Sequence, residues 1–466
     1  MKRSKKRIAV IGSGITGLAA AYRIKQQIER ENLPFELLVL ESAIHSGGSI
    51  FTMKLDEHYF DLGVSGIDTR EKEGLELIDD LGLTDQMVYS QNGKEDLYMF
   101  NQLHHFDFPT YKGLPAKLRD VWKYKNISLH GKLSFMRDAY FPKVSLQQNM
   151  AIGPYLRHRL GSEVTEYIAE PYFSRVYMGD VDQVGIKNSK ERLFRLAEES
   201  GSLIKAIEDH PEIWDADGNY ATFEKGLNVL TEKLTEELGD CIQYNQKVTE
   251  IQPSIQGTYI LDINHKQQVR VGAVCVATGP DSYKSLFTDD KLKGFFNDVQ
   301  MGSVGYLLFS FPKGTIQREP VGFGILTLKR SDSYIKSITL LNKKWPFYGN
   351  EEEYVGVSFG RMGENFLMSL SNKQLEEFVL KELQNILQIT EAPLYRVVKR
   401  WPDALPRYTV KHEQKYPAII SYMEEEYPGV YFAGNGFDGY GVNQCIRQAN
   451  KVSQKVLGHV KEQNRA

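Results

Sequence analysis

The sequence predicts an α/β protein that combines a Rossmann-like domain with a mixed-sheet domain and a mostly helical lobe. The first observation is an unbroken apolar run at residues 8–11, followed by glycines at G-x-G-x-x-G spacing and a helix-forming segment. The second is a series of strand-like segments between residues 242 and 359, and the third is helical spacing of apolar residues within 116–210. Unbroken apolar runs are typical of strands buried on both faces, whereas a 3.6-residue period indicates helices.

The glycine motif predicts a site for a dinucleotide. Gly12 would form the turn after the strand, Gly14 would let a pyrophosphate approach the backbone, and Gly17 would let the helix pack closely on the strand. The start of the helix offers N–H groups and a partial positive charge to phosphate. The predicted phosphate-binding residues are Gly12, Ser13, Gly14, Ile15, Thr16 and Gly17.

A second predicted strand, residues 35–40, ends at an acidic residue. Glu41 follows Gly17 by 41 − 17 = 24 residues, near the ~20 expected for the acid that binds a ribose hydroxyl. The alternative is a signal peptide, because MKRSKK is basic and the next stretch is apolar. A cleaved signal has no use for three glycines at this spacing or for an acid after a second strand, so we prefer the nucleotide site.

The later elements follow from the same patterns. A helix is predicted at 75–83, residues 95–108 alternate loosely as in a hairpin, and residues 221–238 predict a turn followed by an amphipathic helix. The remaining predicted elements are strands at 242–251, 258–263, 269–278, 304–311, 334–341, 354–359 and 430–433, and a helix at 373–387.

The helical lobe carries many basic residues among its apolar ones. They are Lys117, Arg119, Lys123, Lys125, Lys132, Arg137, Arg157 and Arg159. A solvated helix face is one interpretation of this pattern, and a surface that meets a membrane or an acidic ligand is the other.

Composition limits the function classes. A chain of 466 residues exceeds one ordinary core, and 41% hydrophobic with 25% charged residues is usual for a soluble protein. A net charge of −3 gives no general attraction to nucleic acid. Cys241, Cys275 and Cys445 form neither a disulfide framework nor a metal site, and the histidines lack ligand spacing. We expect a cytoplasmic protein without a metal, and leave peripheral contact with the inner face of the membrane open.

A second glycine-rich segment follows the last predicted strand. Gly434, Gly436, Gly439 and Gly441 precede a helix predicted to begin near Val442. Such a helix could direct its N-terminus at the pyrimidine edge of a flavin and favour the anionic reduced form; the alternative is that these glycines only shape a turn. Because only one complete G-x-G-x-x-G follows a strand, we expect one dinucleotide, a non-covalent FAD, which substrate reduces and O2 or another acceptor reoxidises.

The chain resembles the bacterial FAD-dependent porphyrinogen oxidases, the protoporphyrinogen and coproporphyrinogen III oxidases with an amine-oxidase-type flavin fold. The resemblance is carried by VIGSGITGLAAAY, LVLESAIHSGGSI, AEPYFSRVYMGDVD, NKKWP, KRWPDALP and the segment 434–446. It implies a flavin domain (1–85, 222–282 and 396–466), a substrate domain (86–115 and 283–395) and a membrane-associated helical lobe (116–221).

The resemblance also implies site residues. Besides the first glycine motif and Glu41, the implied FAD contacts are Ser42, Gly48, Ser49, Gly63, Val64, Ser65, Gly66, Val248, Trp401, Gly434, Val442, Asn443 and Gln444. The implied substrate contacts lie around Glu71 and Val176. Arg70, Lys72 and Arg175 are our candidates for binding substrate carboxylates, and guanidinium suits this role best because it donates two parallel N–H bonds. The chain departs from the family pattern at 63–66, His45, Ser49 and Glu71.

The activity that the resemblance implies is oxidation of coproporphyrinogen III, protoporphyrinogen IX or both to the porphyrin in haem biosynthesis, with O2 giving H2O2. Other enzymes of the haem pathway are candidate partners. No side chain is marked as an obligatory acid or base. The open alternatives are an amine oxidase of the same fold, and a flavoprotein with an altered substrate or no turnover.

Overall fold

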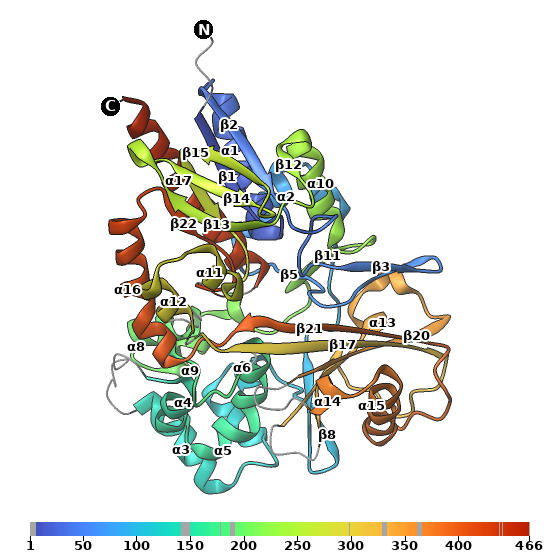
Figure 1. The fold of residues 1–466 in the computed structure, drawn as a ribbon. Helices are drawn as coiled ribbons and strands as arrows, with labels where there is room; N and C mark the ends of the chain where they lie inside the picture. The colour runs from blue at the N-terminus through green and yellow to red at the C-terminus, as the bar shows by residue number, and fades with distance from the viewer. Residues whose placement is uncertain are drawn as a thin grey trace. The chain divides into compact units, whose positions relative to one another are not determined.

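A computed structural model describes residues 6–140, 150–177, 179–186, 192–297, 299–328, 333–360, 366–437, 439 and 441–465. The chain divides into two compact units (Figure 1). Unit 1 comprises residues 1–87, 222–301 and 414–466, and unit 2 comprises residues 88–221 and 302–413.

Unit 1 is built on a five-stranded parallel sheet of order β12-β2-β1-β16-β22. Its strands are β12 (Ile242–Gln243), β2 (Phe35–Leu40), β1 (Lys6–Ile11), β16 (Ala273–Val276) and β22 (Val430–Phe432). Along β1, Ile8 and Val10 enter one hydrophobic cluster, whereas Ala9 and Ile11 enter another. Since successive strand residues face opposite sides, both faces of the sheet are covered, as the unbroken apolar run predicts.

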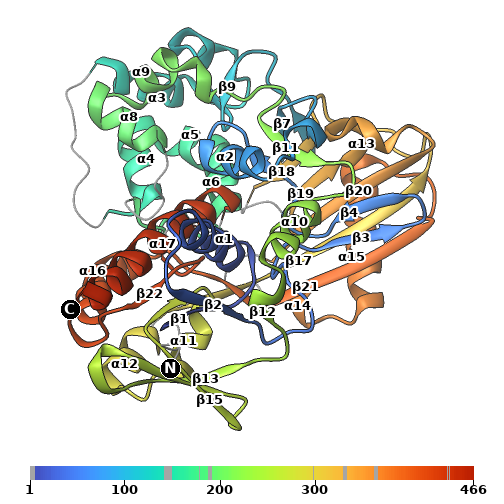
Figure 2. The same ribbon diagram turned by 90° about the horizontal axis from the view of Figure 1, so that it is seen from above.

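Three helices, α1 (Ile15–Arg30), α10 (Asn228–Leu238) and α17 (Val442–Arg465), cover one face of this sheet together with α2 (Lys72–Asp80). Figure 2 shows α1 and α17 side by side next to β1 and β2. The other face carries the antiparallel sheet β13-β14-β15 (Val248–Pro253, Tyr259–Ile263 and Gln267–Val271) with α11 (Pro280–Leu286) and α12 (Asp290–Asn297).

Two predicted strands are wrong in extent. The predicted strand at 269–278 is divided between β15 and β16, which belong to different sheets, and the one at 242–251 is divided between β12 and β13. At the first division the N–H of Gly272 bonds the carbonyl of Arg7 at 2.7 Å, so the chain leaves the antiparallel sheet and joins β1 within one residue.

Unit 2 contains a mixed seven-stranded sheet of order β21-β17-β20-β19-β18-β7-β8. The strands are β21 (Tyr395–Pro406), β17 (Met301–Pro312), β20 (Glu352–Phe359), β19 (Ile335–Leu340), β18 (Gly324–Thr327), β7 (Glu95–Met99) and β8 (Gln102–His104). β7 and β18 are parallel, and β7 and β8 form the predicted hairpin. Helix α15 (Asn372–Leu387) places Leu375 and Val379 in the same cluster as Phe309 of β17.

Unit 2 also contains a series of helices, as the helical spacing within 116–210 predicts. Its helices are α3 (Leu129–Tyr140), α4 (Ile152–Leu160), α5 (Ser162–Val164), α6 (Glu170–Tyr177), α8 (Arg192–Ser200) and α9 (Leu203–Asp209). Arg159 and Asp138 form a buried ion pair there, and Asp138 also accepts the hydroxyl of Ser202 at 2.7 Å. Within the described ranges, no helix is both long enough and apolar enough to span a bilayer.

The other elements are short or connect the larger ones. They are β3 (Thr52–Leu55), β4 (His58–Asp61), β5 (Ile67–Asp68), β6 (Met87–Tyr89), β9 (Thr110–Tyr111), β10 (Leu114–Pro115), β11 (Tyr220–Phe223), α13 (Leu341–Lys344), α14 (Phe366–Ser369), α16 (Val410–Glu426), a π-helical turn Thr165–Ala169, and 3₁₀ turns Thr84–Gln86, Leu118–Lys123, Pro211–Ile213, Gly239–Cys241, Ile255–Gly257 and Pro346–Tyr348.

Candidate functional site

The turn between β1 and α1 has the geometry that the glycine spacing predicts. Gly12 has a φ of +98°, and its N–H bonds the carbonyl of Leu40 at 2.9 Å. A Cβ at Gly17 would lie 1.9 Å from the carbonyl oxygen of Gly12. Only glycine therefore allows α1 to approach the turn this closely.

Gly14 leaves open space at the start of α1. A Cβ there would meet only the Cα of Gly48, at 3.9 Å. Gly47 crosses the turn, donating to the carbonyl of Ser13 at 2.9 Å. Among the described side chains none caps α1, which begins at Ile15, so its first N–H groups are available to an anion. This cradle fits the pyrophosphate of a dinucleotide.

Glu41 is held at the end of β2 by four hydrogen bonds. Its Oε2 accepts the N–H of Ser13 at 2.7 Å and the Ser13 hydroxyl at 2.8 Å. Its Oε1 accepts the N–H of Ala43 at 2.8 Å and the hydroxyl of Ser42 at 3.2 Å. Burial raises the pKa of Glu41, but these hydrogen bonds outweigh burial and the net pKa is lowered. Two of the four donors are rotatable hydroxyls, which can turn away when ribose hydroxyls arrive, so the carboxylate fits its predicted role.

The second glycine segment leads into α17 as predicted. Gly434 has a φ of +114°, and its N–H donates to Oε1 of Gln448 at 3.1 Å. The helix begins at Val442, with the N–H of Cys445 bonded to the carbonyl of Gly441 at 3.0 Å. The partial positive charge of this 24-residue helix lies at that end.

Two predicted cofactor residues at the start of α17 have other partners. Asn443 is 2% exposed, and its side chain accepts the N–H of Gly74 and donates to the carbonyl of Asp68, both at 2.8 Å. Gln444 donates to Glu71 at 2.8 Å. The amide of Asn443 thus stabilises the start of α2, and the Nε2 of Gln444 is engaged by Glu71.

The remaining predicted cofactor residues are spread over both units. Ser42, Gly48 and Ser49 are exposed, and Val248 is buried at the start of β13. The loop that departs from the family pattern precedes β5 and comprises Gly63, Val64, Ser65 and Gly66. The side chain of Val64 packs against the hydrophobic cluster that includes α1. Trp401 belongs to unit 2, on β21, with the Nζ of Lys399 5.8 Å from its ring centroid.

The candidate substrate residues beside β5 are ion-paired. The guanidinium of Arg70 contacts Asp68, at 2.8 Å from Nε and 2.6 Å from NH2. Glu71 bonds Arg447 as well as Gln444. Arg447 was missed by sequence reasoning; its signal is that it follows Asn443 and Gln444 by four and three residues and so shares their side of α17.

The candidate substrate residues in unit 2 lie on α6. Arg175 forms an ion pair with Glu95 of β7, and its carbonyl accepts Nζ of Lys336 at 3.0 Å. Burial lowers the pKa of Arg175, but Glu95 and nearby tyrosines outweigh burial and raise it. The side chain is 26% exposed. Val176 packs partly buried on the helical core.

Cys445 is buried beside the nucleotide turn. It is 6% exposed, and burial raises its pKa to about 11 although a hydrogen bond with Thr16 opposes the shift. A neutral buried thiol is a poor nucleophile.

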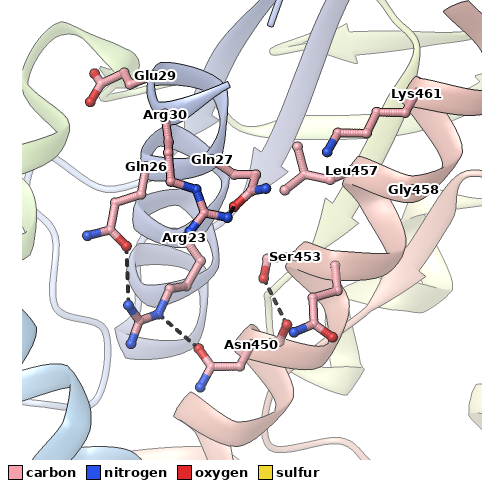
Figure 3. Close-up of a pocket in the computed structure, with 11 residues that line it drawn as sticks. Arg23, Gln26, Gln27, Glu29, Arg30, Asn450, Ser453, Leu457, Gly458 and Lys461 are labelled. Carbon is pink, nitrogen blue, oxygen red and sulfur yellow. Dashed lines mark hydrogen bonds between the residues drawn. The ribbon is translucent and has the colours of Figure 1, made fainter. Parts of the chain in front are cut away.

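A polar groove of about 1070 Å³ lies between α1 and α17 (Figure 3). Arg23 crosses it, donating to Asn450 and Gln26 at 3.2 Å each. Its other lining residues are Gln27, Glu29, Arg30, Ser453, Gln454, Leu457, Gly458 and Lys461. Arg23, the lining residue nearest the start of α1 at Ile15, lies eight residues along the helix, or roughly 12 Å at the ~1.5 Å rise per residue. The groove is therefore separate from the nucleotide turn.

Comparison with known proteins extends these observations to the whole chain. A model of the flavin containing amine oxidoreductases matches residues 15–457. The chain is 28% identical to coproporphyrinogen III oxidase of Bacillus subtilis (strain 168), covering 99% of this chain and 100% of the relative. It is 26% identical to the coproporphyrinogen III oxidase of Staphylococcus aureus (strain NCTC 8325 / PS 47), with 98% and 100% covered.

A solved structure supports the fold. A protein of Exiguobacterium sp. 255-15, assigned as a protoporphyrinogen oxidase, superposes with a TM-score of 0.85 at 24% identity, covering 98% of this chain and 99% of that one. The glycine cradle, the acid at the end of β2 and the family match together show that this chain belongs to the flavin containing amine oxidoreductases and is an FAD-dependent oxidoreductase.

Proposed function

We propose that this protein oxidises a porphyrinogen, with coproporphyrinogen III as the first candidate, to the porphyrin. The observation that carries the proposal is full-length similarity to two relatives named coproporphyrinogen III oxidase, combined with a nucleotide cradle that fits FAD. A relative named protoporphyrinogen oxidase from Nicotiana tabacum, 24% identical over 96% of this chain, makes protoporphyrinogen IX the second candidate.

Bound FAD would supply the two-electron oxidation. Three such rounds remove six hydrogens from the macrocycle, and with O2 as the acceptor they give three H2O2. The chain's own part would be to bind and orient. The N–H groups at Ile15, Thr16 and Gly17 would hold pyrophosphate, Glu41 would accept ribose hydroxyls, and the start of α17 would stabilise negative charge on the reduced flavin.

Substrate carboxylates need cations, and the chain holds its candidates in ion pairs. Arg70 is bound to Asp68 and Arg175 to Glu95. An incoming substrate carboxylate would therefore share the arginine with an internal acid or displace that acid. The free energy of binding gained would be smaller than with an unpaired guanidinium. We therefore expect the positions of the arginines to determine substrate specificity more than a general attraction of the site for polyanions.

We further propose that FAD is bound without a covalent link. Cys445, next to the cofactor segment, is buried, with a pKa raised to about 11. Acid precipitation should release a yellow supernatant, and flavin retained in the pellet would contradict the proposal.

We propose that the protein is cytoplasmic and makes peripheral contact with the inner face of the membrane. In the helical part, Trp122, Leu129, Leu133 and Tyr140 are exposed by 48, 63, 53 and 71%, and the Nζ of Lys132 lies 5.9 Å from the Trp122 ring centroid. Exposed aromatic and leucine side chains among basic ones are typical of surfaces that lie on anionic bilayers.

The direct test is aerobic incubation of the purified protein with coproporphyrinogen III and with protoporphyrinogen IX, followed by porphyrin fluorescence and H2O2. We expect fluorescence to appear with at least one of them, in an FAD-dependent manner. Turnover of a primary amine without any porphyrin formation would identify an amine oxidase instead.

A further inference from the structure

A charged network fastens the first two turns of α17 to the segment before and at the start of α2. Gln444 Nε2 donates to Oε1 of Glu71 at 2.8 Å. Arg447 donates to Oε2 of Glu71 through NH2, and to Oε1 of Glu73 through Nε at 2.6 Å. These residues are separated by more than 370 positions in sequence, and all belong to unit 1.

Gln444 is the third residue of α17, and its side chain lies against the glycines that precede the helix. A Cβ at Gly441 would be 2.0 Å from Oε1 of Gln444, and a Cβ at Gly439 would be 2.9 Å from its Cγ. Glycine at both positions lets the Gln444 side chain fold back over the N-terminal end of the helix. The bond to Glu71 then fixes that side chain in place.

The network carries one positive and two negative charges when it is fully ionised. Arg447 is the cation, and Glu71 and Glu73 are the anions, with side chains 26, 29 and 16% exposed. Burial raises the pKa of Glu73, but the hydrogen bond and charge of Arg447, a backbone hydrogen bond and the charge of Lys72 together outweigh burial, and the net pKa is lowered. Glu71 has a raised pKa, because burial and the charges of Asp68 and Glu73 outweigh the attraction of Arg447.

The neighbouring charged side chains have other ion-pair partners. Arg70 is engaged by Asp68, and Lys72 points outward, 77% exposed, toward Glu76 at 3.0 Å. Among the described side chains, Arg447, Glu71 and Glu73 are the charged groups of the network that binds the start of α17.

We propose that Glu71 is a positioning residue for the flavin end of α17. Through Gln444 and Arg447 it fixes the first turns of the helix, and its carboxylate charge sets how readily the bound flavin accepts electrons. The inference rests on the FAD assignment and deepens it, independently of which substrate is oxidised. A negative charge here opposes the anionic reduced flavin, which the helix N-terminus favours.

Variants that change one charge at a time separate this role from a purely structural one. Glu71→Gln keeps an acceptor for Gln444 but removes the charge, so the flavin midpoint potential should rise. Arg447→Gln removes the cation and should lower it. Glu76→Gln, on the exposed side of α2, is the matched control and should leave the potential unchanged.

Midpoint potentials are measured on the FAD-loaded proteins by dye equilibration, and FAD affinity by fluorescence quenching on the apoproteins. Glu71→Ala should bind FAD more weakly because Gln444 loses its acceptor, and Glu71→Gln should restore affinity to within about tenfold of wild type. Because burial disfavours the charged form of Glu71, the glutamine variant should remain folded at neutral pH.

Shifts of opposite sign for Glu71→Gln and Arg447→Gln would support the inference. Equal potentials, or shifts in the same direction, would overturn it and leave the network a structural clamp. If porphyrinogens fail to reduce the wild-type flavin while the opposite shifts are seen, the substrate assignment is wrong and this inference is supported.

Discussion

Glu41 accepts both the backbone N–H and the hydroxyl of Ser13, at 2.7 and 2.8 Å. The acid at the end of β2 is thereby bonded to the turn that would bind pyrophosphate. This carboxylate therefore fixes the predicted ribose-binding and pyrophosphate-binding segments of the protein relative to each other.

Replacing Glu41 by alanine should weaken FAD binding by roughly ten- to a hundredfold, since a hydrogen bond to a charged group contributes ~1.5–3 kcal/mol. The measurement is quenching of FAD fluorescence on the apoprotein. Glu36→Ala, on the same strand with a side chain 44% exposed, is the control. FAD affinity equal to wild type would show that Glu41 does not contact the ribose.

The stabilising contribution of Glu41 should depend on pH. Its pKa is lowered in the folded state, so the contribution is present above the unfolded value of about 4.3 and is lost as pH falls through the folded pKa. Urea unfolding of apo wild type and Glu41→Gln should differ at pH 7 and converge below about pH 4. A difference that stays constant to the lowest pH would contradict the hydrogen-bonded, ionised carboxylate.

Arg175→Ala should raise KM for coproporphyrinogen by up to about tenfold, and less for protoporphyrinogen, because four carboxylates offer more contacts than two. The effect should shrink at high salt, since the side chain is partly exposed. Removing Arg175 leaves Glu95 without its ion-pair partner, so Arg175→Ala/Glu95→Gln is measured beside it. Equal, salt-independent changes for both substrates would assign Arg175 to the lobe's structure alone.

Trp122→Ala/Leu133→Glu should reduce cosedimentation with vesicles of equal phosphatidylglycerol and phosphatidylcholine severalfold. The wild-type protein should bind vesicles of pure phosphatidylcholine more weakly than vesicles that contain phosphatidylglycerol, and added salt should release it from the latter. Ile255→Glu, at an apolar side chain 65% exposed in unit 1, is the control. Equal binding by the helical-lobe variant and the control would exclude this face as the membrane contact.

Local patterns predicted the parts of the fold and site that are built from contiguous residues. Gly12 and Gly17, the strand ending at Glu41 and the start of α17 at Val442 each depend on neighbours a few positions away. The exchange of sheets at Gly272 was not predicted, because the alternating strand β15, with Val269 and Val271, continues into the apolar strand β16 with only this single glycine between them.

Contacts between distant segments could not be predicted. Sequence marked Glu71 as a substrate residue by position, whereas the structure pairs it with Arg447, 376 residues away. The ion pair between Arg70 and Asp68, by contrast, joins residues only two positions apart. Sequence proximity alone does not distinguish such a pair from an arginine that is free to bind substrate.

The most direct test of the central claim is anaerobic stopped-flow spectroscopy of the FAD-loaded protein mixed with coproporphyrinogen III, with protoporphyrinogen IX and with a primary amine. The visible absorption band of the oxidised flavin should bleach with a porphyrinogen, return when O2 is admitted, and stay unchanged with the amine. A flavin that bleaches with the amine and with neither porphyrinogen would contradict the account.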